Sequence, residues 1–230
     1  MSRIVVVGVG GLGCPAALAL AESGAPLELV LVDDDRVERS NLARQVLFQE
    51  QDVGEPKAAA AAGRLRALGS LPPSSRRAQV EFQNIRFSGS TAAALLRGAD
   101  VLLDASDNFE TRFVANDACV AAGVPLVHGA ALGWEGRLLT ILPGRTACLR
   151  CLFEGPPTGP VPTCAEAGVA SPLCGLVGAA MARAALKILA GTPEAGVLRR
   201  WATRTGAERP LSLRRDPSCA CGILPPCPSP

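Results

Sequence analysis

Four glycines near the start of the chain are spaced for binding phosphate. Gly8, Gly10, Gly11 and Gly13 lie in the stretch VVVGVGGLG, between a β-branched run and an alanine-rich one. A tight glycine turn between a strand and a helix lets backbone N–H groups at the helix N-terminus approach a phosphate closely. The pattern predicts a nucleotide site, although nicotinamide, flavin and adenylate binders all share it.

A carboxylate at the end of the next apolar run favours an adenosine ligand. Asp33 ends LELVLVD, twenty residues after Gly13. At this position the dinucleotide fingerprint expects an acidic side chain that accepts hydrogen bonds from ribose hydroxyls. The alternative is that the DDD triplet is only a polar loop at a strand end.

Two cations are expected where a helix disfavours them. Pro56 suits the first position of a helix, which puts Lys57 in the first turn, near the positive end of the helix dipole. Arg44 also lies in a first turn if Asn41 caps its helix. Each cation alone is typical of a solvated surface. A bound anion would remove both conflicts, so together they predict a polyphosphate site.

A magnesium ligand is predicted at the end of a later strand, in DASDN. Asp107 lies at the carboxyl edge of this strand, where open α/β sheets bind their ligands. A capping box between Asp107 and Glu110 is the alternative, and it needs no ligand. Both roles remain open at this point.

Four cysteines have spacings typical of metal ligands. Cys148 and Cys151 form C-x-x-C, and Cys219 and Cys221 follow in DPSCACG. Four thiolates can enclose one structural zinc ion, and redox-active or unpaired thiols are the alternative.

The elements that position these residues alternate along the chain. Apolar β-branched runs predict strands, and alanine-rich runs predict helices. The predicted strands span residues 4–7, 27–33, 80–87, 99–106 and 124–130, and the helices follow residue 13, begin near 56, and span 108–123 and 171–191. This order predicts an α/β, Rossmann-like, largely parallel sheet with flanking helices. Strand-like pieces at 136–144, 198–206 and 210–216 predict a C-terminal antiparallel extension on the substrate side.

Composition bounds the class of protein. The 230 residues are 48% hydrophobic and 19% charged, which favours one ordered domain. We expect that domain at 1–222, with a nucleotide-binding half at 1–135, a substrate-side half with a crossover loop at 136–222, and a flexible tail at 223–230. Arg183 and Lys187 favour a buried helix over a membrane span at 171–191.

Charge and targeting signals exclude other classes. The net charge of +2 is too small for a nucleic-acid footprint. Arginines do gather near the C-terminus, where we favour a solvated sheet face over a docking patch for an acidic partner: Arg199, Arg200, Arg204, Arg209, Arg214 and Arg215. No signal peptide is visible, so we expect a cytoplasmic protein in which nine cysteines have a role other than disulfides.

Taken together, these motifs resemble those of the ubiquitin-activating-like adenylyltransferases, the family of HesA, MoeB and ThiF. The likeness covers most of the chain, through VVVGVGGLG, NLARQ, VGEPK, DASDNFETR, ACLRCLF and CAEAGVASPLCGLVG. It implies ATP binding with magnesium on Asp107, ribose on Asp33, and phosphates cradled by the glycines. The other residues implied at the site are Asn41, Arg44, Gln45, Lys57 and Asn108.

The resemblance also implies the reaction and the partners. A small ubiquitin-like sulfur carrier ending in Gly-Gly would be activated to an acyl adenylate with release of pyrophosphate, by a homodimer, with a separate protein as sulfur donor. Cys164 matches a position that bonds covalently to the carrier in some members, and an inert thiol is the alternative. The catalytic candidates are Arg44, Lys57, Asp107 and Cys164.

The sequence departs from the family pattern in two places. The second cysteine pair is C-x-C rather than C-x-x-C, which makes Cys227 a substitute ligand. The expected N-terminal helix, with an arginine for the neighbouring subunit, is not present before the first strand, so another residue or a partner would supply that charge. Alternatives are an adenylating enzyme for another carboxylate or a tRNA base, a catalytically weak binder of ubiquitin-like proteins, and a nicotinamide oxidoreductase. His128 is expected in the core or site wall, and Cys14, Cys119 and Cys174 in the core.

Overall fold

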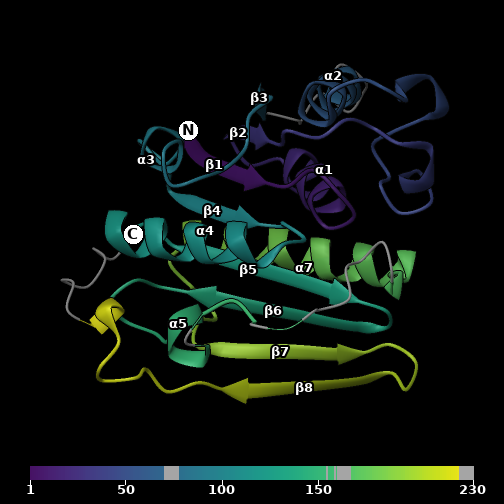
Figure 1. Cartoon of the computed structure of the whole chain (residues 1–230). Coiled ribbons are helices and arrows are strands. Elements are labelled where there is room, and N and C mark those ends of the chain that lie inside the picture. Colours follow the sequence, from purple (N-terminus) through teal and green to yellow (C-terminus); the bar gives the residue numbers. More distant parts are fainter. Residues whose placement is uncertain (70–77, 154, 158, 160–166, 223–230) are drawn as a thin grey trace.

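The computed structural model describes residues 1–69, 78–153, 155–157, 159 and 167–222 (Figure 1). Within them an eight-stranded sheet runs in the order β3-β2-β1-β4-β5-β6-β7-β8. The strands are β1 Ser2–Val7, β2 Leu27–Val32, β3 Gln79–Gln83, β4 Val101–Asp104, β5 Leu126–Leu132, β6 Glu135–Ile141, β7 Val197–Ala202 and β8 Ala207–Ser212. The α-helices are α1 Gly13–Glu22, α2 Lys57–Gly69, α3 Ala92–Leu95, α4 Phe109–Ala122, α5 Leu149–Leu152 and α7 Ser171–Leu189, and the 3-10 helices are η1 Arg39–Asn41, η2 Glu50–Asp52 and η3 Ala220–Gly222.

Strand direction divides the sheet at β5. The strands β3, β2, β1, β4 and β5 pair in parallel, whereas β6, β7 and β8 form an antiparallel meander on the far side of β5. The parallel part follows from the alternating strands and helices, because a helical crossover returns each strand in the same direction. The predicted Rossmann-like sheet and its antiparallel extension are therefore confirmed.

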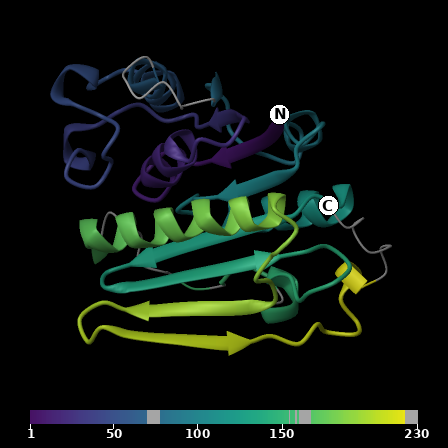
Figure 2. The ribbon, with the colours of Figure 1, turned by 180° about the vertical axis from the view of Figure 1, so that it is seen from behind.

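Two apolar cores cover the two faces of this sheet. The helices α1, α2 and α7 pack on one face, and α3, α4 and α5 pack on the other. Figure 1 shows α4 in front of the strands, and the opposite view in Figure 2 brings α7 to the front. Among the described helices, α7 alone has the length and hydropathy of a membrane span, but one of its faces is buried in the core, from Leu173 to Ile188.

The turn between β1 and α1 requires glycine at two positions. Gly8 has φ +83°, a conformation that residues with a side chain rarely adopt. A Cβ at Gly13 would lie 1.9 Å from the carbonyl oxygen of Gly8. The motif therefore closes this turn by bringing two backbone segments into direct contact.

The structure corrects one local prediction, the condition placed on Asn41 and the alternative given for Asp107. The strand expected through residue 87 ends at Gln83, because its partner β2 ends at Val32 and leaves no backbone to pair with. Asn41 caps no helix: it ends η1, and turns follow it. Asp107 forms no capping box with Glu110, because Asn108 is the N-cap of α4 and accepts a hydrogen bond from the backbone N–H of Thr111.

Candidate nucleotide site

A pocket of about 480 Å³ opens at the carboxyl ends of β1, β2 and β4. This size is within the usual range for small-molecule sites. The pocket is lined by ten of the eleven residues predicted to contact nucleotide: Gly8, Gly10, Gly11, Asp33, Asn41, Arg44, Gln45, Lys57, Asp107 and Asn108. Gly13 does not line it and instead closes the turn beneath. The fold thus brings together motifs spread from Gly8 to Asn108.

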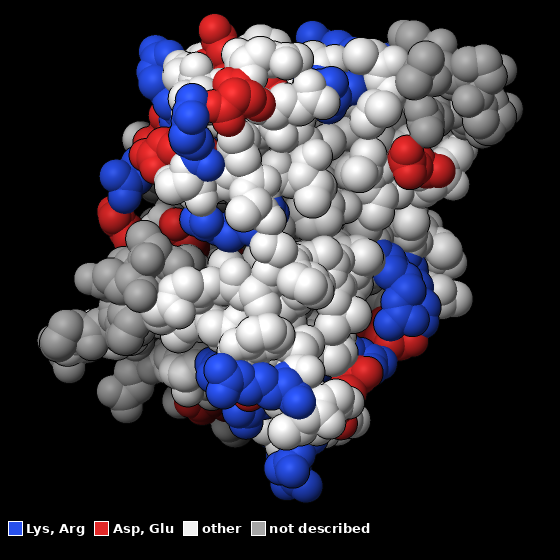
Figure 3. All heavy atoms as spheres, turned by 90° about the vertical axis from the view of Figure 1, so that its right-hand side faces the viewer, with Lys and Arg blue, Asp and Glu red and all other residues white. Residues whose placement is uncertain are grey.

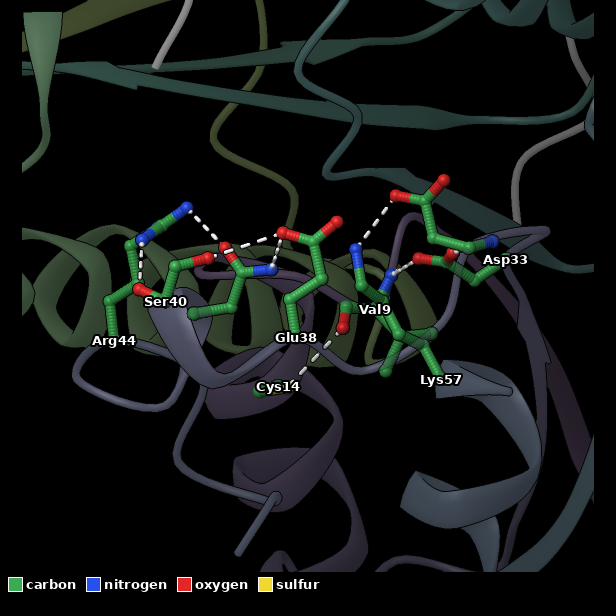
Figure 4. A network of polar contacts seen from close by, with 9 residues as sticks. Val9, Cys14, Asp33, Glu38, Ser40, Arg44 and Lys57 are labelled. Carbon is green, nitrogen blue, oxygen red and sulfur yellow. Dashed lines mark hydrogen bonds and ion pairs between the residues drawn. The ribbon is translucent and has the colours of Figure 1, made fainter. Parts of the chain in front are cut away.

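Arg44 is held at the pocket by its own segment (Figure 4). Its guanidinium donates to the Oδ1 of Asn41 at 2.6 Å and to the carbonyl oxygen of Ser40 at 3.2 Å. The Nδ2 of Asn41 donates to Glu38 at 3.4 Å. Asn41 is buried, so this side chain fixes the direction of a partly exposed cation. The predicted cation is present, but side-chain contacts position it rather than a helix N-terminus.

Lys57 begins α2, as predicted, and is buried. Its Nζ donates to the Oδ2 of Asp35 at 2.7 Å. Burial alone would lower the pKa of Lys57, but the hydrogen bond to Asp35 and the charges of Asp33, Asp35 and Asp107 raise it above its ordinary value. Lys57 therefore stays charged. The sequence analysis missed Asp35 as a partner, and the only signal for it was the DDD triplet.

Asp33 lies beside the glycine turn and binds backbone donors (Figure 4). The N–H of Val9 donates to its Oδ2 at 2.6 Å, and the N–H of Asp35 donates to its Oδ1 at 2.9 Å. Burial raises the pKa of this carboxyl, although both hydrogen bonds and the charge of Lys57 oppose that effect. Asp33 therefore joins the ends of β1 and β2 at the predicted ribose position.

The residues of the pocket suit a polar ligand. Gln45 is 3% exposed, and its Oε1 has no hydrogen-bond partner within the described part of the chain. A buried amide oxygen without a partner is costly, and a donor on a bound ligand would satisfy it. A Cβ at Gly11 would lie 3.1 Å from the Sγ of Cys174, so the glycine also keeps this wall of the pocket open.

Asp107 is free to bind a cation. Its side chain lines the pocket and is exposed, and among the described residues it makes no hydrogen bond or ion pair. Asn108 caps α4 in its place. A hard oxygen ligand in this position suits magnesium. A second acidic group lines the same pocket, with one oxygen each of Asp33, Asp34 and Asp35 within 4.8 Å of one another.

A buried network supports the turn that carries Asp107. The fully buried Asp104, at the end of β4, accepts from the Oγ of Ser106 at 2.6 Å and contacts the Nδ1 of His128 at 2.7 Å. Arg112 donates to the carbonyl oxygen of Ser106. Burial alone would raise the pKa of Asp104, but the hydrogen bonds from His128 and Ser106 and the charge of Arg112 lower it. His128 is thus a buried side chain behind the site, as expected. Its pairing with Asp104 was not foreseen, because strand register cannot be read from the sequence.

The four predicted cysteine ligands come together. The Sγ atoms of Cys148, Cys151, Cys219 and Cys221 all lie within 4.8 Å of one another. Cys148 and Cys219 are 3.7 Å apart, and Cys151 and Cys221 are 3.5 Å apart. Tetrahedral zinc with Zn–S bonds of about 2.3 Å places its sulfurs about 3.8 Å apart. The C-x-C spacing of Cys219 and Cys221 therefore does not prevent the four thiols from converging. Cys221 lies in the 3-10 helix η3.

The segments that carry the cysteine cluster, α5 and the stretch after β8, lie toward the end of the sheet opposite to the arrowheads of β1 and β4 (Figure 1). Cys148 follows the end of β6, which is antiparallel to β5, so the cluster is at the amino edge of the parallel strands. A metal there would serve structure. Cys164 and Cys227 and the expected tail at 223–230 lie outside the described residues. Cys14, Cys119 and Cys174 are buried, and burial raises the pKa of Cys14 to about 12, which makes it unreactive.

Comparison with known proteins agrees with this geometry. The ThiF family profile matches residues 1–221. The chain is 45% identical over 233 residues to the sulfur carrier protein adenylyltransferase of Thermus thermophilus, covering 97% of this chain and 83% of the relative. It is 46% identical over 225 residues to the SAMP-activating enzyme E1 of Haloferax volcanii, covering 96% and 80%. Escherichia coli MccB bound to MccA-N7isoASN superposes with a TM-score of 0.82 at 23% identity, over 96% of this chain and 67% of that one, a likeness of fold alone.

Proposed function

The chain belongs to the ThiF family, and from this premise we propose that it is an ATP-dependent adenylyltransferase. Its substrate is the C-terminal carboxylate of a small ubiquitin-like sulfur carrier ending in Gly-Gly. Two relatives that align with nearly the whole chain are named sulfur carrier protein adenylyltransferase and SAMP-activating enzyme E1. The observation that carries the proposal is the single pocket, into which separate segments bring Arg44, Lys57, Asp107 and the glycine turn.

The reaction joins two anions. A carboxylate oxygen of the carrier attacks the α-phosphorus of ATP, a new P–O bond forms, and the bond to the β-phosphate oxygen breaks. Pyrophosphate leaves with the electron pair, and no proton transfer to a protein side chain is required. Neutralising the crowded phosphates and aligning the carboxylate therefore supply most of the acceleration.

The pocket residues divide these tasks. In our proposal the glycine turn and Gln45 hold the nucleotide, and Asp33 binds its ribose. Arg44 and Lys57 bind phosphate oxygens, and Asp107 with the neighbouring Asn108 holds magnesium, which would supply further neutralising charge. Asn41 keeps Arg44 directed into the pocket through the 2.6 Å hydrogen bond.

We propose structural zinc on Cys148, Cys151, Cys219 and Cys221. The supporting observation is the convergence of the four Sγ atoms within 4.8 Å, with two separations close to those of a tetrahedral site. Zinc there would join α5 to the segment after β8, which lies seventy residues further along the chain.

The wider organisation is also a proposal. Residues 1–222 would form one adenylyltransferase domain, with nucleotide binding in 1–135 and carrier binding in 136–222. The protein would act in the cytoplasm as a homodimer, with a separate sulfur donor. The thiolate of Cys164 would attack the carbonyl carbon of the acyl adenylate, so that a thioester to the carrier forms as the bond to AMP breaks and AMP leaves.

Pyrophosphate exchange tests the proposal. We expect the purified protein to exchange labelled pyrophosphate into ATP only when a Gly-Gly-ending ubiquitin-like protein of the same genome is added. Arg44→Ala should weaken ATP binding. Arg97→Ala should not, because this exposed arginine precedes β4 and lies near the amino ends of the parallel strands, away from the pocket. Absence of exchange with every such carrier, together with unchanged ATP affinity in Arg44→Ala, would refute it.

A further inference from the structure

Three arginines lie side by side on the antiparallel extension. Strand register places Arg137 of β6 opposite Arg200 of β7, and Arg200 opposite Arg209 of β8. Directly paired residues project from the same face of a sheet, with Cβ atoms about 5 Å apart. All three are exposed. We call Arg137, Arg200 and Arg209 the arginine row.

The arginine row is poorly neutralised. Its only ion pair among the described residues joins Arg200 to Glu135, at 4.0 Å. Arg137 and Arg209 make no hydrogen bond or ion pair within that part of the chain. Like charges on directly opposed residues destabilise a sheet, so the row has an electrostatic cost that the one ion pair with Glu135 offsets only in part.

The opposite face of the same strands is different. Arg199 is adjacent to Arg200 in sequence and therefore projects from the other face, toward α7. Its guanidinium binds Glu194 at 2.7 Å and Glu208 at 2.8 Å. The extension thus has one balanced face and one basic face. A merely solvated sheet would not explain why Arg199 has two carboxylate partners on its face, whereas the three arginines of the row share only Glu135.

The arginine row begins beside the nucleotide pocket. Arg137 pairs with Ala130 of β5, one residue before Ala131, which lines the pocket from the opposite face of the strand, so the row starts at the strand end that borders the pocket. Figure 3 views this edge of the sheet end-on and shows basic side chains gathered at the lower end, with a few acidic ones among them. An extended tail reaching the pocket would leave the body of its protein near this face.

The neighbouring residues favour docking onto the face rather than addition of a strand. Leu211, on the same face as Arg209, is 53% exposed and offers an apolar contact. Pro210 lies between them on the edge strand β8 and lacks the N–H that a further strand would need.

We propose that the arginine row docks an acidic surface of the ubiquitin-like carrier while the Gly-Gly tail occupies the pocket. The inference rests on the proposed function and adds the surface that selects the partner. Exposed charges of this kind mainly raise the rate of encounter and fix orientation. The row should therefore affect affinity for the whole carrier and leave the chemical step unchanged.

Charge reversal tests the surface. In the double variant Arg137→Glu/Arg200→Glu, we expect the KM for the carrier in pyrophosphate exchange to rise at least tenfold at low salt. The kcat and the Kd for ATP should not change. The wild-type KM should rise with salt, and that of the variant should not. The matched control is Arg97→Glu, which should behave as wild type. Arg97 is exposed and precedes the central strand β4, outside the antiparallel extension.

Two measurements separate failure of this inference from failure of the proposed function. Calorimetric titration of the carrier reports docking even without exchange, so a wild type that binds but does not react would disprove the function alone. An unchanged KM and Kd for the carrier in the double variant would overturn the docking surface. Binding of RNA or anionic vesicles that the double variant loses, with carrier affinity unchanged, would overturn it as well. Recovery of affinity by acidic-to-lysine changes on the carrier would support it.

Discussion

The Nζ of Lys57 lies 2.7 Å from the Oδ2 of Asp35, so the buried cation of the pocket is paired with a carboxylate. Asp35 is largely exposed, whereas Lys57 is buried. A phosphate can therefore replace Asp35, because the displaced carboxylate turns to water at little cost while the lysine stays in place.

Lys57→Ala should raise the Kd for ATP about 10- to 100-fold, since a hydrogen bond to a charged group contributes roughly 1.5–3 kcal/mol. Asp35→Asn should leave the Kd unchanged or lower it, because the lysine then has a weaker competitor. Lys187→Ala, which removes a partly exposed lysine paired with Glu194, is the control. Fluorescence titration measures all three. Equal affinities for Lys57→Ala and Lys187→Ala would contradict a phosphate role.

Asp107→Asn should reduce carrier-dependent pyrophosphate exchange about 100-fold, the usual loss when one preorganised electrostatic contact is removed. The variant should also need more magnesium for half-maximal exchange. Glu110→Gln changes a nearby carboxylate that pairs with Arg86, and should have no such effect. If both variants responded to magnesium like wild type, another group of the pocket would hold the metal.

Elemental analysis should find one zinc per chain. Cys219→Ser should lose the metal and lower the Tm, since a structural site needs all four ligands. Cys227→Ser should keep it, which distinguishes the cluster from the substitute ligand that the C-x-C spacing suggests. Cys174→Ser is a control in a buried thiol outside the cluster. Zinc retained by Cys219→Ser and lost by Cys227→Ser would reverse the assignment.

Asp104→Ala should cost about 3 kcal/mol or more in the free energy of unfolding, because His128 would keep a buried ring nitrogen without its hydrogen-bond partner. The folded state lowers the pKa of Asp104. The contribution of Asp104 to the free energy of unfolding is therefore complete above its pKa in the unfolded state, about 3.9. It disappears as pH falls toward the lower pKa of the folded state.

Urea unfolding at pH 6 and pH 3.5 checks this prediction. The wild type should lose more stability between the two values than Asp104→Asn does. The groups that face Asp104 are His128 on β5, Ser106 beyond β4, and Arg112 and Cys119 on α4. Asp100→Asn, at an exposed carboxylate, serves as the control. Equal pH dependence in Asp104→Asn and wild type would show that Asp104 is not linked to folding.

Cys164→Ser should leave carrier-dependent pyrophosphate exchange unchanged, because formation of the acyl adenylate needs no protein nucleophile. It should abolish a covalent complex of enzyme and carrier in mass spectra taken under non-reducing conditions. A complex that persists in the variant would assign that bond to another thiol.

The sequence was sufficient for the order of elements and for most of the pocket residues. Alternating strands and helices predicted the parallel sheet, and Gly123 ends α4 in the left-handed conformation, as expected. Residue types specified the pocket because phosphate binding needs glycines and cations at fixed points of this topology. The contacts Lys57–Asp35 and Asp104–His128 were not predictable, because each joins segments whose relative position depends on tertiary packing.

The arginines at the C-terminus show the same limit. Alternation along the expected strand already places the neighbours Arg199 and Arg200 on opposite faces, but only strand register shows which charged residues share a face with each of them. We favoured a solvated surface because charge-rich strands usually are exposed. The structure pairs Arg199 with two glutamates, whereas Arg137 and Arg209 have no ion pair among the described residues. Composition alone does not contain this distinction.

A continuous sheet places limits on how this enzyme could be dissected. The division expected after residue 135 falls within β6, whose backbone pairs with β5 from Glu135 to Ile141. A fragment ending there would leave the hydrogen-bonding edge of β5 bare, and such an edge is a template for aggregation. Nucleotide recognition and partner recognition therefore cannot be shuffled between relatives as separate modules, and hybrid enzymes should be built by exchanging surface residues.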